Sequence, residues 1–457
     1  MFIGRVAELE KLGKLYDVGK FEMVVMLGRR RVGKTTLINE FIRDKESIFF
    51  AASETNGAQN LAELSNAINK DGSVFPDFKT AFEAIFKLAE NRRIVFVIDE
   101  YPYLTSCSKG ISSVLQHIID RNLNNSNLFF IICGSSVSFM ENQVLGYKSP
   151  LFGRRTAQFR IKPFDFVGSR GFFPNYNAHD AALAYGITGG IPLYMTKIND
   201  SFPLSENIKQ EFLDVTGYFY EEPTNLIKQE CREPAQYNSI ISAIARGASR
   251  LSEIATKIGN EKTSIVSGYL NTLIEIGVVK KETPFGEKNS RRTVYTVSDS
   301  MFRFWYRFVL SHVSLITMEQ SDKAYDLIEP QLSHFMGAVF EEICKQYLWR
   351  LLKEGSSAID FIDLGRWWGT DPLTKTQAEI DIMGTGEKDA ALFCECKWTN
   401  EKIDLPVLEA LVARSELFGF TNKHFYLFAK TGFTKGCITR ATEMGNVSLV
   451  RFEELVG

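Results

Sequence analysis

The chain has 457 residues, 45% of them hydrophobic, and a formal net charge of −2 at pH 7. This length predicts about three domains, and the near-neutral charge excludes an overall attraction to nucleic acid, so any DNA-binding surface must be local. The N-terminus lacks the apolar core of a signal peptide, and no uncharged apolar run approaches the roughly 18 residues that span a bilayer. We therefore expect a cytoplasmic protein with no membrane partner. Seven cysteines, an odd number in mostly apolar surroundings, indicate reduced thiols.

The first motif in the chain is a phosphate-binding loop. Residues 28–36 read Gly-Arg-Arg-Arg-Val-Gly-Lys-Thr-Thr; they follow an apolar run at 22–27 and precede an amphipathic run at 37–42. A strand, a glycine loop and a helix in this order form a P-loop, whose backbone N–H groups surround phosphates. Lys34 brings a positive charge to the β- and γ-phosphates of ATP, and the Thr35 hydroxyl binds Mg²⁺. The candidate nucleotide-binding residues are Gly28, Arg31, Val32, Gly33, Lys34, Thr35 and Thr36.

Two acidic residues follow the apolar run at 94–98. Asp99, at the end of such a strand, can hold Mg²⁺ directly or through water, and Glu100 can polarise the attacking water. The alternative is that Asp99 only caps a helix after a core strand. Another apolar run, 128–133, ends in Gly-Ser-Ser, where Ser135 can sense the γ-phosphate or the attacking water. An ordinary turn is the alternative there.

Short apolar strands alternate with helical stretches from residue 1 to about 165. The predicted strands are 22–27, 47–53, 94–98, 128–133 and 156–162. This alternation is typical of an α/β fold in which a parallel sheet is covered on both faces. Residues 166–234 are expected to be helical, 301–330 to form a helical linker, and 331–457 to form a last α/β domain.

Residues 235–300 predict a winged helix-turn-helix. Three helical stretches, 236–246, 250–258 and 262–277, precede two strands near 278–281 and 293–297. Residues 246–292 contain nine Lys and Arg but only five Glu. The excess of positive charge lies mainly in the wing, which suits binding to the phosphate backbone of DNA. A packing or protein-docking module is the alternative. The aromatic run that follows, 302–308, is expected to be core rather than a base-stacking surface.

Two strand-like runs in the last domain, 379–383 and 391–398, carry a second group of charges. Glu395 and Lys397 share a strand face, and Asp381 joins them if the hairpin pairs odd residues with odd. Two carboxylates and a lysine on one face can bind Mg²⁺ and polarise a water for phosphodiester attack. A surface salt bridge between Glu395 and Lys397 is the alternative.

A helix predicted around residues 337–341 can supply a further carboxylate, Glu341. Cys394 and Cys396 alternate with Glu395 and so face the other side of the strand. Zinc usually takes four ligands, and the nearest candidates, His424 and Cys437, stand alone. We therefore interpret both thiols as core.

Taken in order, these motifs resemble those of the archaeal-type P-loop ATPases, an ASCE-type family near the AAA and STAND groups. The resemblance covers essentially the whole chain. The opening Phe2-Ile3-Gly4-Arg5 is similar to the family's start, which implies that Gly4 and Arg5 lie by the adenine. The segment Ile-Asp-Glu-Tyr-Pro-Tyr-Leu at 98–104 resembles the Walker B segment, which implies ATP and Mg²⁺ as cofactors.

Two further elements carry the same resemblance. Residues 149–155 resemble the family's P-L-x-G-R element, which implies that Arg154 is an arginine finger, acting in cis or from a neighbouring copy in a homo-oligomer. Gly190-Ile191-Pro192 resembles the G-x-P element of STAND proteins, which implies that Pro192 folds over the nucleotide.

The C-terminal part resembles a domain of unknown function that often accompanies such ATPases and is similar to the PD-(D/E)XK nuclease fold. Its elements match at 337–341, 365–368, 379–381 and 395–397. The resemblance implies a nuclease site on DNA, with Asp381 and Glu395 as metal ligands. The candidate catalytic residues are Glu341, Asp381, Glu395 and Lys397.

Together these motifs predict an ATP-driven switch. An ATPase core (1–165) binds Mg-ATP, a helical lid (166–234) closes over it, and a winged helix (235–300) relays the state through the linker (301–330) to a nuclease-like domain (331–457). One alternative is a nucleotide-gated DNA-binding or signalling scaffold with slow turnover. Another is an ATPase whose nuclease-like domain is an inactive assembly module.

Overall fold

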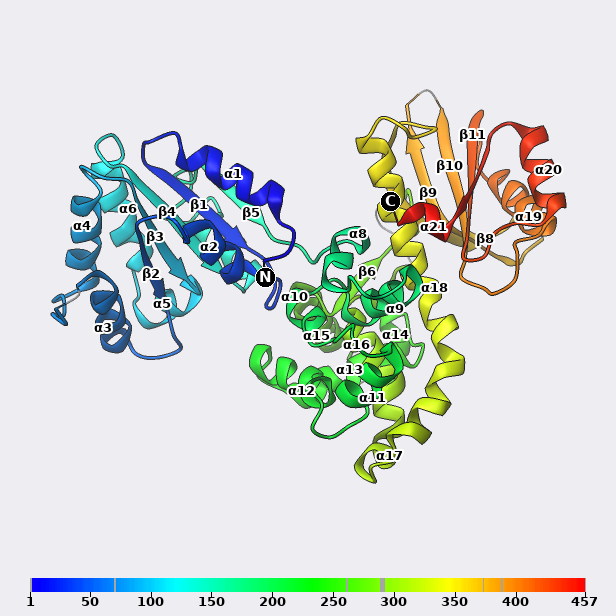
Figure 1. Ribbon diagram of the computed structural model, residues 1–457, viewed down its shortest axis with the longest axis horizontal. Helices are drawn as coiled ribbons and strands as arrows, with labels where there is room; N and C mark the ends of the chain where they lie inside the picture. The colour runs from blue at the N-terminus through cyan, green and yellow to red at the C-terminus, as the bar shows by residue number, and fades with distance from the viewer. Residues whose placement is uncertain are drawn as a thin grey trace. The chain divides into compact units, whose positions relative to one another are not determined.

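The structure is a computed structural model that describes residues 2–69, 71–259, 262–287, 292–372, 374–387 and 389–456. Glu261, Lys288 and Arg291, which count among the charges of the predicted winged helix, lie outside these ranges. The chain forms two compact units (Figure 1). The first comprises Met1–Pro163 with Ile191–Leu193, and the second comprises Phe164–Gly190 with Tyr194–Gly457.

The first unit is built on five parallel strands in the order β2-β3-β4-β1-β5. They are β1 (Glu22–Leu27), β2 (Ser47–Ala51), β3 (Ile94–Asp99), β4 (Leu128–Gly134) and β5 (Ala157–Arg160). Every residue of β1, β3 and β4 is buried, as expected for parallel strands covered on both faces. The predicted parallel sheet is confirmed.

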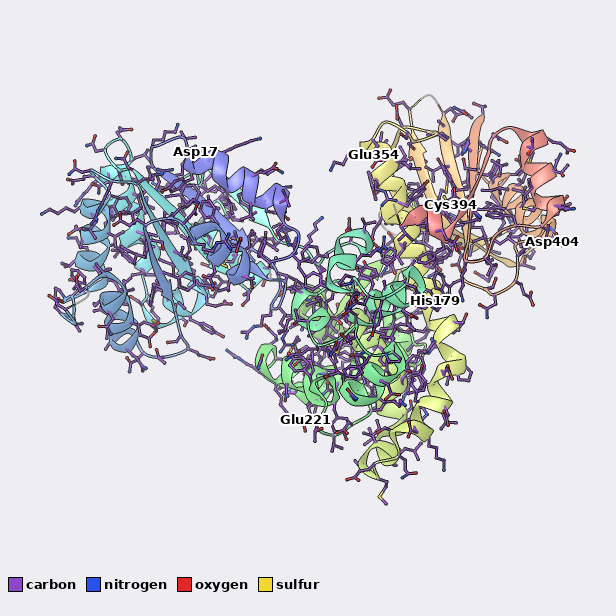
Figure 2. The ribbon with its side chains drawn as sticks, viewed as in Figure 1. Asp17, His179, Glu221, Glu354, Cys394 and Asp404 are labelled. Carbon is purple, nitrogen blue, oxygen red and sulfur yellow. The ribbon has the colours of Figure 1, made fainter. Side chains whose placement is uncertain are left out.

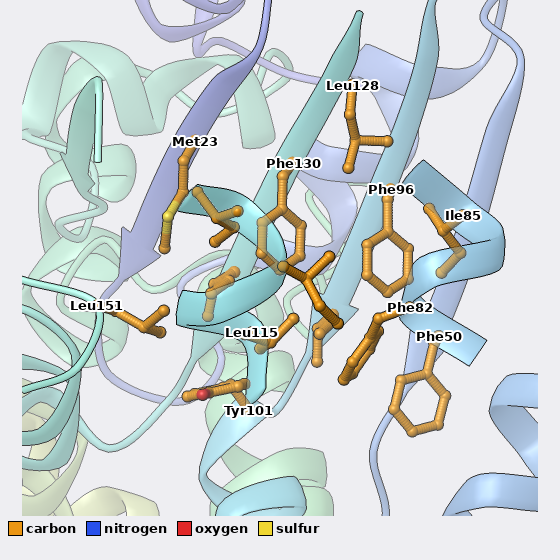
Figure 3. Packing of buried hydrophobic residues seen from close by; sticks show 14 of the residues in the cluster. Met23, Phe50, Phe82, Ile85, Phe96, Tyr101, Leu115, Leu128, Phe130 and Leu151 are labelled. Atoms are coloured by element: carbon orange, nitrogen blue, oxygen red, sulfur yellow. The ribbon is translucent and has the colours of Figure 1, made fainter. Parts of the chain in front are cut away.

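Helices cover both faces of this sheet. They are α1 (Val6–Tyr16), α2 (Lys34–Ile42), α3 (Gly57–Ile68), α4 (Phe78–Leu88), α5 (Tyr101–Cys107), α6 (Ile111–Asn122), α7 (Val137–Phe139) and the π-helix η1 (Met140–Val144). One face packs against α1 and α2, and the other against α3, α4, α5 and α6. Figure 3 shows the second core, in which the Phe96 and Phe130 rings stack with centroids 5.1 Å apart and Phe82 packs beside them. This double burial fixes the strand ends at which the candidate site lies.

The second unit begins with helices. They are α8 (Phe166–Ser169), η2 (Arg170–Phe172), α9 (Ala178–Thr188), α11 (Leu204–Phe212) and α12 (Tyr218–Glu230). The short helix α10 (Pro192–Met195) is divided, since Pro192 and Leu193 belong to the first unit. Three further helices precede an antiparallel ribbon: α13 (Pro234–Ala245), α14 (Leu251–Lys257), α15 (Thr263–Glu275), β6 (Val279–Glu282) and β7 (Val294–Val297). The helices and strands predicted between residues 235 and 300 are therefore present.

The aromatic run packs as core. It forms α16 (Ser300–Phe304) and the π-helix η3 (Trp305–Val309), and Phe302, Phe304 and Phe308 are fully buried. The centroids of the Phe304 and Phe335 rings lie 5.6 Å apart. This burial confirms the prediction that the aromatic run is core. η4 (Leu310–His312) and α17 (Val313–Thr317) follow.

One predicted boundary falls inside a helix. α18 (Ser321–Lys353) runs without a break through residues 330 and 331, where the sequence suggested a change from linker to domain. Pro330 lacks an N–H and would ordinarily end a helix. Apolar residues at helical spacing on both sides of it, Ile328, Leu332 and Phe335, are buried, and their packing keeps the helix continuous.

A mixed five-stranded sheet completes the second unit, in the order β12-β11-β10-β9-β8. Its elements are β8 (Phe361–Thr370), β9 (Gln377–Gly386), β10 (Ala390–Lys397), α19 (Leu405–Ser415), β11 (Asn422–Ala429), α20 (Lys435–Met444), β12 (Val447–Arg451) and α21 (Phe452–Leu455). β8, β9 and β10 are antiparallel neighbours, and β10, β11 and β12 are parallel. β9 and β10 pair Met383 with Phe393, so odd residues face odd residues as the hairpin prediction required.

The two faces of this sheet carry different chemistry. Phe393 belongs to the apolar core formed with α19 and α20. Cys394, labelled in Figure 2, and Cys396 alternate with it, and Cys396 lies beside Cys344 of α18. All seven cysteines are free thiols.

The segment between β6 and β7 contacts the edge of the sheet. The Phe285 N–H donates to the Arg366 carbonyl oxygen of β8 over 2.9 Å. Arg292 Nη1 donates to the Trp368 carbonyl oxygen over 3.0 Å, and Trp368 Nε1 donates back to the Arg292 carbonyl oxygen over 3.1 Å. The ribbon is therefore docked on β8. Among the described residues, no helix combines the length and apolarity needed to cross a membrane.

Candidate functional site

The phosphate-binding loop joins the end of β1 to the start of α2. Arg31 and Gly33 have left-handed backbones, with φ of 71° and 86°. A non-glycine residue in this conformation is strained, and such strain recurs at ligand sites. Gly28 has no room for a side chain, because a Cβ there would lie 2.4 Å from the Ile161 carbonyl oxygen. α2 begins at Lys34, so the unpaired N–H groups of its first turn lie at the loop and suit an anion.

Lys34, Thr35 and Asp99 meet at this loop. Lys34 is only 6% exposed, and its Nζ donates to the carbonyl oxygens of Gly28 (2.8 Å) and Arg29 (3.1 Å). Thr35 Oγ1 donates to Asp99 Oδ2 over 2.6 Å, which places a hydroxyl beside a buried carboxylate at the end of β3. Oxygen ligands of this kind suit Mg²⁺. Thr35 and Asp99 therefore fit the metal that Mg-ATP requires.

Glu100 and Ser135 follow adjacent strands and hydrogen-bond to each other. Glu100 has a left-handed backbone, with φ of 50°. Its Oε2 accepts from Ser135 Oγ over 2.8 Å and from Ser135 N over 3.2 Å. Two donors on one oxygen fix the orientation of the Glu100 carboxylate. Ser135 thus positions the group predicted to act on water.

The N-terminal segment reaches the same loop. Gly4 and Arg5 both have positive φ, 66° and 59°. Arg5 Nη2 donates to the Lys162 carbonyl oxygen over 2.5 Å and to the Val32 carbonyl oxygen over 3.4 Å. Arg5 therefore joins the start of the chain to the loop and to the segment after β5.

Pro192 also lies at the loop. The segment Ile191–Leu193 belongs to the first unit. A Cβ on Gly33 would lie 3.7 Å from Pro192 Cγ, and the Leu193 N–H donates to the Arg31 carbonyl oxygen over 3.5 Å. The exposed Thr36 side chain lies in the first turn of α2. Each candidate nucleotide-binding residue thus lies in or beside the loop.

Arg154 is held by a bidentate ion pair that the sequence did not suggest. Its Nε and Nη2 donate to the two carboxylate oxygens of Asp120, each over 2.7 Å. Its Nη1 donates to the Pro150 and Phe152 carbonyl oxygens, over 2.8 and 3.0 Å. The side chain is 22% exposed. To act as an arginine finger, Arg154 must release Asp120.

A second group of charges lies in the C-terminal sheet, around Glu395. Glu395 is 5% exposed; its Oε1 lies 2.5 Å from Lys397 Nζ, and its Oε2 lies 2.8 Å from Arg414 Nη2. Arg414, on α19, also donates to the Glu379 carbonyl oxygen over 2.5 Å. Burial opposes the charge on Lys397, but Glu395 keeps the pKa of this lysine above its usual value. In this pair the Glu395 carboxylate is buried, whereas the Lys397 side chain is 38% exposed, so the ion pair is only partly buried.

Asp381 and Glu341 join this group. Asp381 Oδ2 accepts from the Cys396 N–H over 2.8 Å. Burial, and then the Glu395 carboxylate, raise the pKa of Asp381 to about 6. Burial, and then the Asp381 carboxylate, raise the pKa of Glu341 to about 7. The structure thus brings together the four residues that the sequence proposed, three carboxylates and one lysine.

Two arginines of this group were missed. Arg414 and Glu395 are 19 residues apart, and no motif links them. Arg366, on β8, pairs with Glu379 and lowers the pKa of Glu341 against the effect of burial. Only the fold reveals that a helix and an edge strand bring these cations to the carboxylates.

The C-terminal group does not form a ready metal site. Within the described ranges, no three His, Cys, Asp or Glu side chains are placed to hold a metal ion together. Both oxygens of Glu395 are paired with cations. A divalent metal at Asp381 and Glu395 does not fit until Arg414 or Lys397 moves away.

The basic ribbon is partly engaged in contacts within the chain. Lys280 lies 2.7 Å from Glu282. Arg292 forms an ion pair with Glu287 and contacts the main chain of Trp368. These contacts reduce the charge that the ribbon offers to a phosphate backbone.

Comparisons with known proteins match two parts of the chain to family models. Residues 2–198 match the family model described as an ATPase domain predominantly from Archaea, and residues 305–407 match the model described as Archaea bacterial proteins of unknown function. An uncharacterized protein of Methanocaldococcus jannaschii is 33% identical over 404 residues, which is 88% of each chain. An uncharacterized ATP-binding protein of the same organism is 44% identical over 46 residues, 10% of this chain and 78% of its own. The solved structure of a Walker-type ATPase of Pyrococcus abyssi has a TM-score of 0.54 at 20% identity, covering 67% of this chain and 96% of that one. This last likeness shows a shared fold.

Proposed function

Because the chain belongs to the family of archaeal-type ATPases, we propose that it binds Mg-ATP at the loop of 28–36 and hydrolyses it, acting as a nucleotide-driven switch. The observation that carries this proposal is the hydrogen bond between Thr35 and Asp99 beside the buried Lys34 ammonium. Main-chain N–H groups, an ammonium, a hydroxyl and a carboxylate are the kinds of group that bind a nucleoside triphosphate and Mg²⁺, and their proximity supports the proposal.

Each residue has a defined task in this proposal. Lys34 exchanges its carbonyl partners for phosphate oxygens and neutralises their charge. Thr35 and Asp99 would hold a magnesium ion, which would supply charge to polarise the γ-phosphate. Glu100, oriented by Ser135, accepts the proton of the attacking water. Arg5 and Pro192 keep the chain segments on either side of the loop in place for the nucleotide.

Glu100→Gln tests this assignment. The variant keeps the shape of the side chain and loses the base, so ATP binding measured by calorimetry should be retained, and kcat should fall by about 10²- to 10⁴-fold. Lys34→Ala should weaken binding itself. Glu90→Gln is the matched control, because it makes the same replacement at an exposed glutamate of the same unit. Equal turnover in Glu100→Gln and wild type would remove Glu100 from the mechanism.

A second candidate function is phosphodiester cleavage by a PD-(D/E)XK-like domain. The convergence of Glu341, Asp381, Glu395 and Lys397 favours it. The pairing of Glu395 with Arg414 opposes it, because the metal has no free pair of carboxylates. In the inactive alternative, the same charges only hold the sheet together as an assembly module.

Manganese calorimetry distinguishes these two cases. If Arg414 only masks a metal site, Arg414→Ala should bind Mn²⁺ more tightly than wild type, and Asp381→Asn in the same background should abolish the gain. DNA cleavage assays with Mn²⁺, with ATP and with a non-hydrolysable analogue should follow the same order. If neither variant binds Mn²⁺, the remaining explanation is that the domain is an inactive assembly module.

DNA is the partner we propose for a winged helix formed by α13, α14, α15 and the ribbon. Lys281, an exposed base of β6 without an ion pair among the described residues, supports this contact. Such a contact would weaken with salt, since each neutralised phosphate releases counterions.

A further inference from the structure

A cavity of about 730 Å³ opens in the second unit. None of its lining residues belongs to the phosphate-binding loop or to the charged group around Glu395, although part of its wall comes from α13 and α14 of the proposed winged helix. This volume lies within the range of roughly 300–1,000 Å³ that is typical of small-molecule pockets. The walls come from α12, α13, α14, η3 and the residues next to them, and include Asn238, Ser242, Arg246, Lys257 and Trp305. None of the described residues that line the cavity is acidic.

Two cations lie at one edge of this cavity. Lys257 Nζ donates to the main-chain oxygen of Arg246 over 3.1 Å, which brings the ammonium to the residue that carries the guanidinium. Both side chains are exposed. The Arg246 guanidinium makes no hydrogen bond or ion pair with any residue that the structure describes. Two adjacent cations in a concave site without a carboxylate attract an anion.

The rest of the wall offers neutral and apolar groups. Tyr306 donates its hydroxyl hydrogen to Asn238 Oδ1 over 2.6 Å, so the amide group of Asn238 remains a donor for a ligand. Trp305 also lines the cavity with the 8% of its surface that is exposed, and its Nε1–H donates to the Tyr220 carbonyl oxygen over 2.9 Å, so this hydrogen is already used within the chain. Ile258 and Leu310 add aliphatic surface.

From these contacts we propose that the cavity binds a small organic anion. Its phosphate or carboxylate lies between Arg246 and Lys257, and its planar apolar part lies against Trp305. The bound anion would connect α12, α13 and α14 with η3, because each contributes to the wall. An extended nucleic-acid backbone is a different ligand, since it would use the two cations and leave the apolar wall unfilled.

Calorimetry on the full-length Lys34→Ala variant tests this proposal, because the phosphate-binding loop then contributes little. The probes are 1-naphthyl phosphate, 1-naphthoate and 1-naphthol, which share a ring system and differ in the anionic group. We expect either anion to bind at least tenfold more tightly than naphthol, and the stronger of the two identifies the anion class. Arg246→Ala or Lys257→Ala should weaken binding by about 10-fold or more, since hydrogen bonds to charged groups are lost.

Two variants complete the design. Lys228→Ala removes an exposed cation of α12 that does not line the cavity, and it should leave binding unchanged. Ser242→Phe should block the cavity by filling it, with circular dichroism to confirm that the variant folds. Equal affinity for naphthol and both anions, or binding that survives Arg246→Ala and Lys257→Ala, would overturn the proposal. So would duplex DNA binding that needs both cations while neither aromatic anion binds.

Discussion

Replacing Glu341 by glutamine should stabilise the protein at alkaline pH and have little effect near pH 4. Burial, and then the Asp381 carboxylate, raise the pKa of Glu341 from 4.5 to about 7. A carboxyl group whose pKa is higher in the folded state holds its proton more tightly there. The folded protein therefore loses stability as the pH rises from 4.5 to about 7, and this loss is complete above pH 7. Glutamine resembles the protonated acid and does not titrate.

The size of the effect follows from the two pKa values. At about 1.4 kcal/mol per pH unit, the difference between 4.5 and about 7 corresponds to about 3 kcal/mol of unfolding free energy at pH 8. For a unit of this size, that is a difference in Tm of about 5 °C between Glu341→Gln and wild type. Near pH 4 both forms are neutral at this position, and the two Tm values should converge.

Thermal unfolding between pH 4 and pH 8.5 measures this difference, with EDTA present so that no metal adds to the stability. Glu342→Gln changes the exposed neighbour on the same helix and is the control; its Tm should follow wild type throughout. Parallel pH profiles for Glu341→Gln and wild type would refute the reasoning, because they would show a carboxylate that is solvated and far from Asp381.

Three further outcomes are expected. As the predicted finger, Arg154→Ala should lower the kcat for ATP at least tenfold, whereas Asp120→Ala, which removes only its partner, should not; equal losses would make the pair structural. Phe130→Ala removes a fully buried ring stacked on Phe96 and should cost about 3–5 kcal/mol in urea unfolding; a cost near zero would contradict the packing. Lys281→Ala should lower the slope of log K against log salt for duplex DNA by about one, and an unchanged slope would exclude this residue from the contact.

Local patterns predicted the elements well, because each is encoded in neighbouring residues. The loop of 28–36 is continuous in sequence, and the alternation in β10 set which side chains share a face. Whether Asp381 shares that face depended on the hairpin register, which the sequence left open and the pairing of Met383 with Phe393 supplies. The helix through Pro330 was not predicted, because its continuity depends on burial against other elements.

Contacts between distant elements were beyond local patterns. Arg414 reaches Glu395 only because α19 packs on the face that Phe393 occupies. Arg154 and Asp120 are 34 residues apart, on a turn and a helix. Such pairs depend on how elements pack, and a single chain carries no periodic signal for them. These contacts also change the chemistry most, since they decide which charges are free.

The ribbon covers an edge strand that could otherwise pair with a second copy of the chain. β8 is the edge of its sheet, and an uncovered edge strand offers main-chain groups to any other chain. The Phe285 N–H takes up the Arg366 carbonyl oxygen at this edge, and its ring packs so tightly that a Cβ on Gly365 would lie 2.7 Å from it. A fragment that begins after the ribbon would lose this cover at Gly365 and Arg366, on a strand whose Ile362 side chain is already 75% exposed. The C-terminal sheet expressed alone is therefore expected to aggregate edge to edge. In the whole chain, the ribbon covers this edge and limits such pairing.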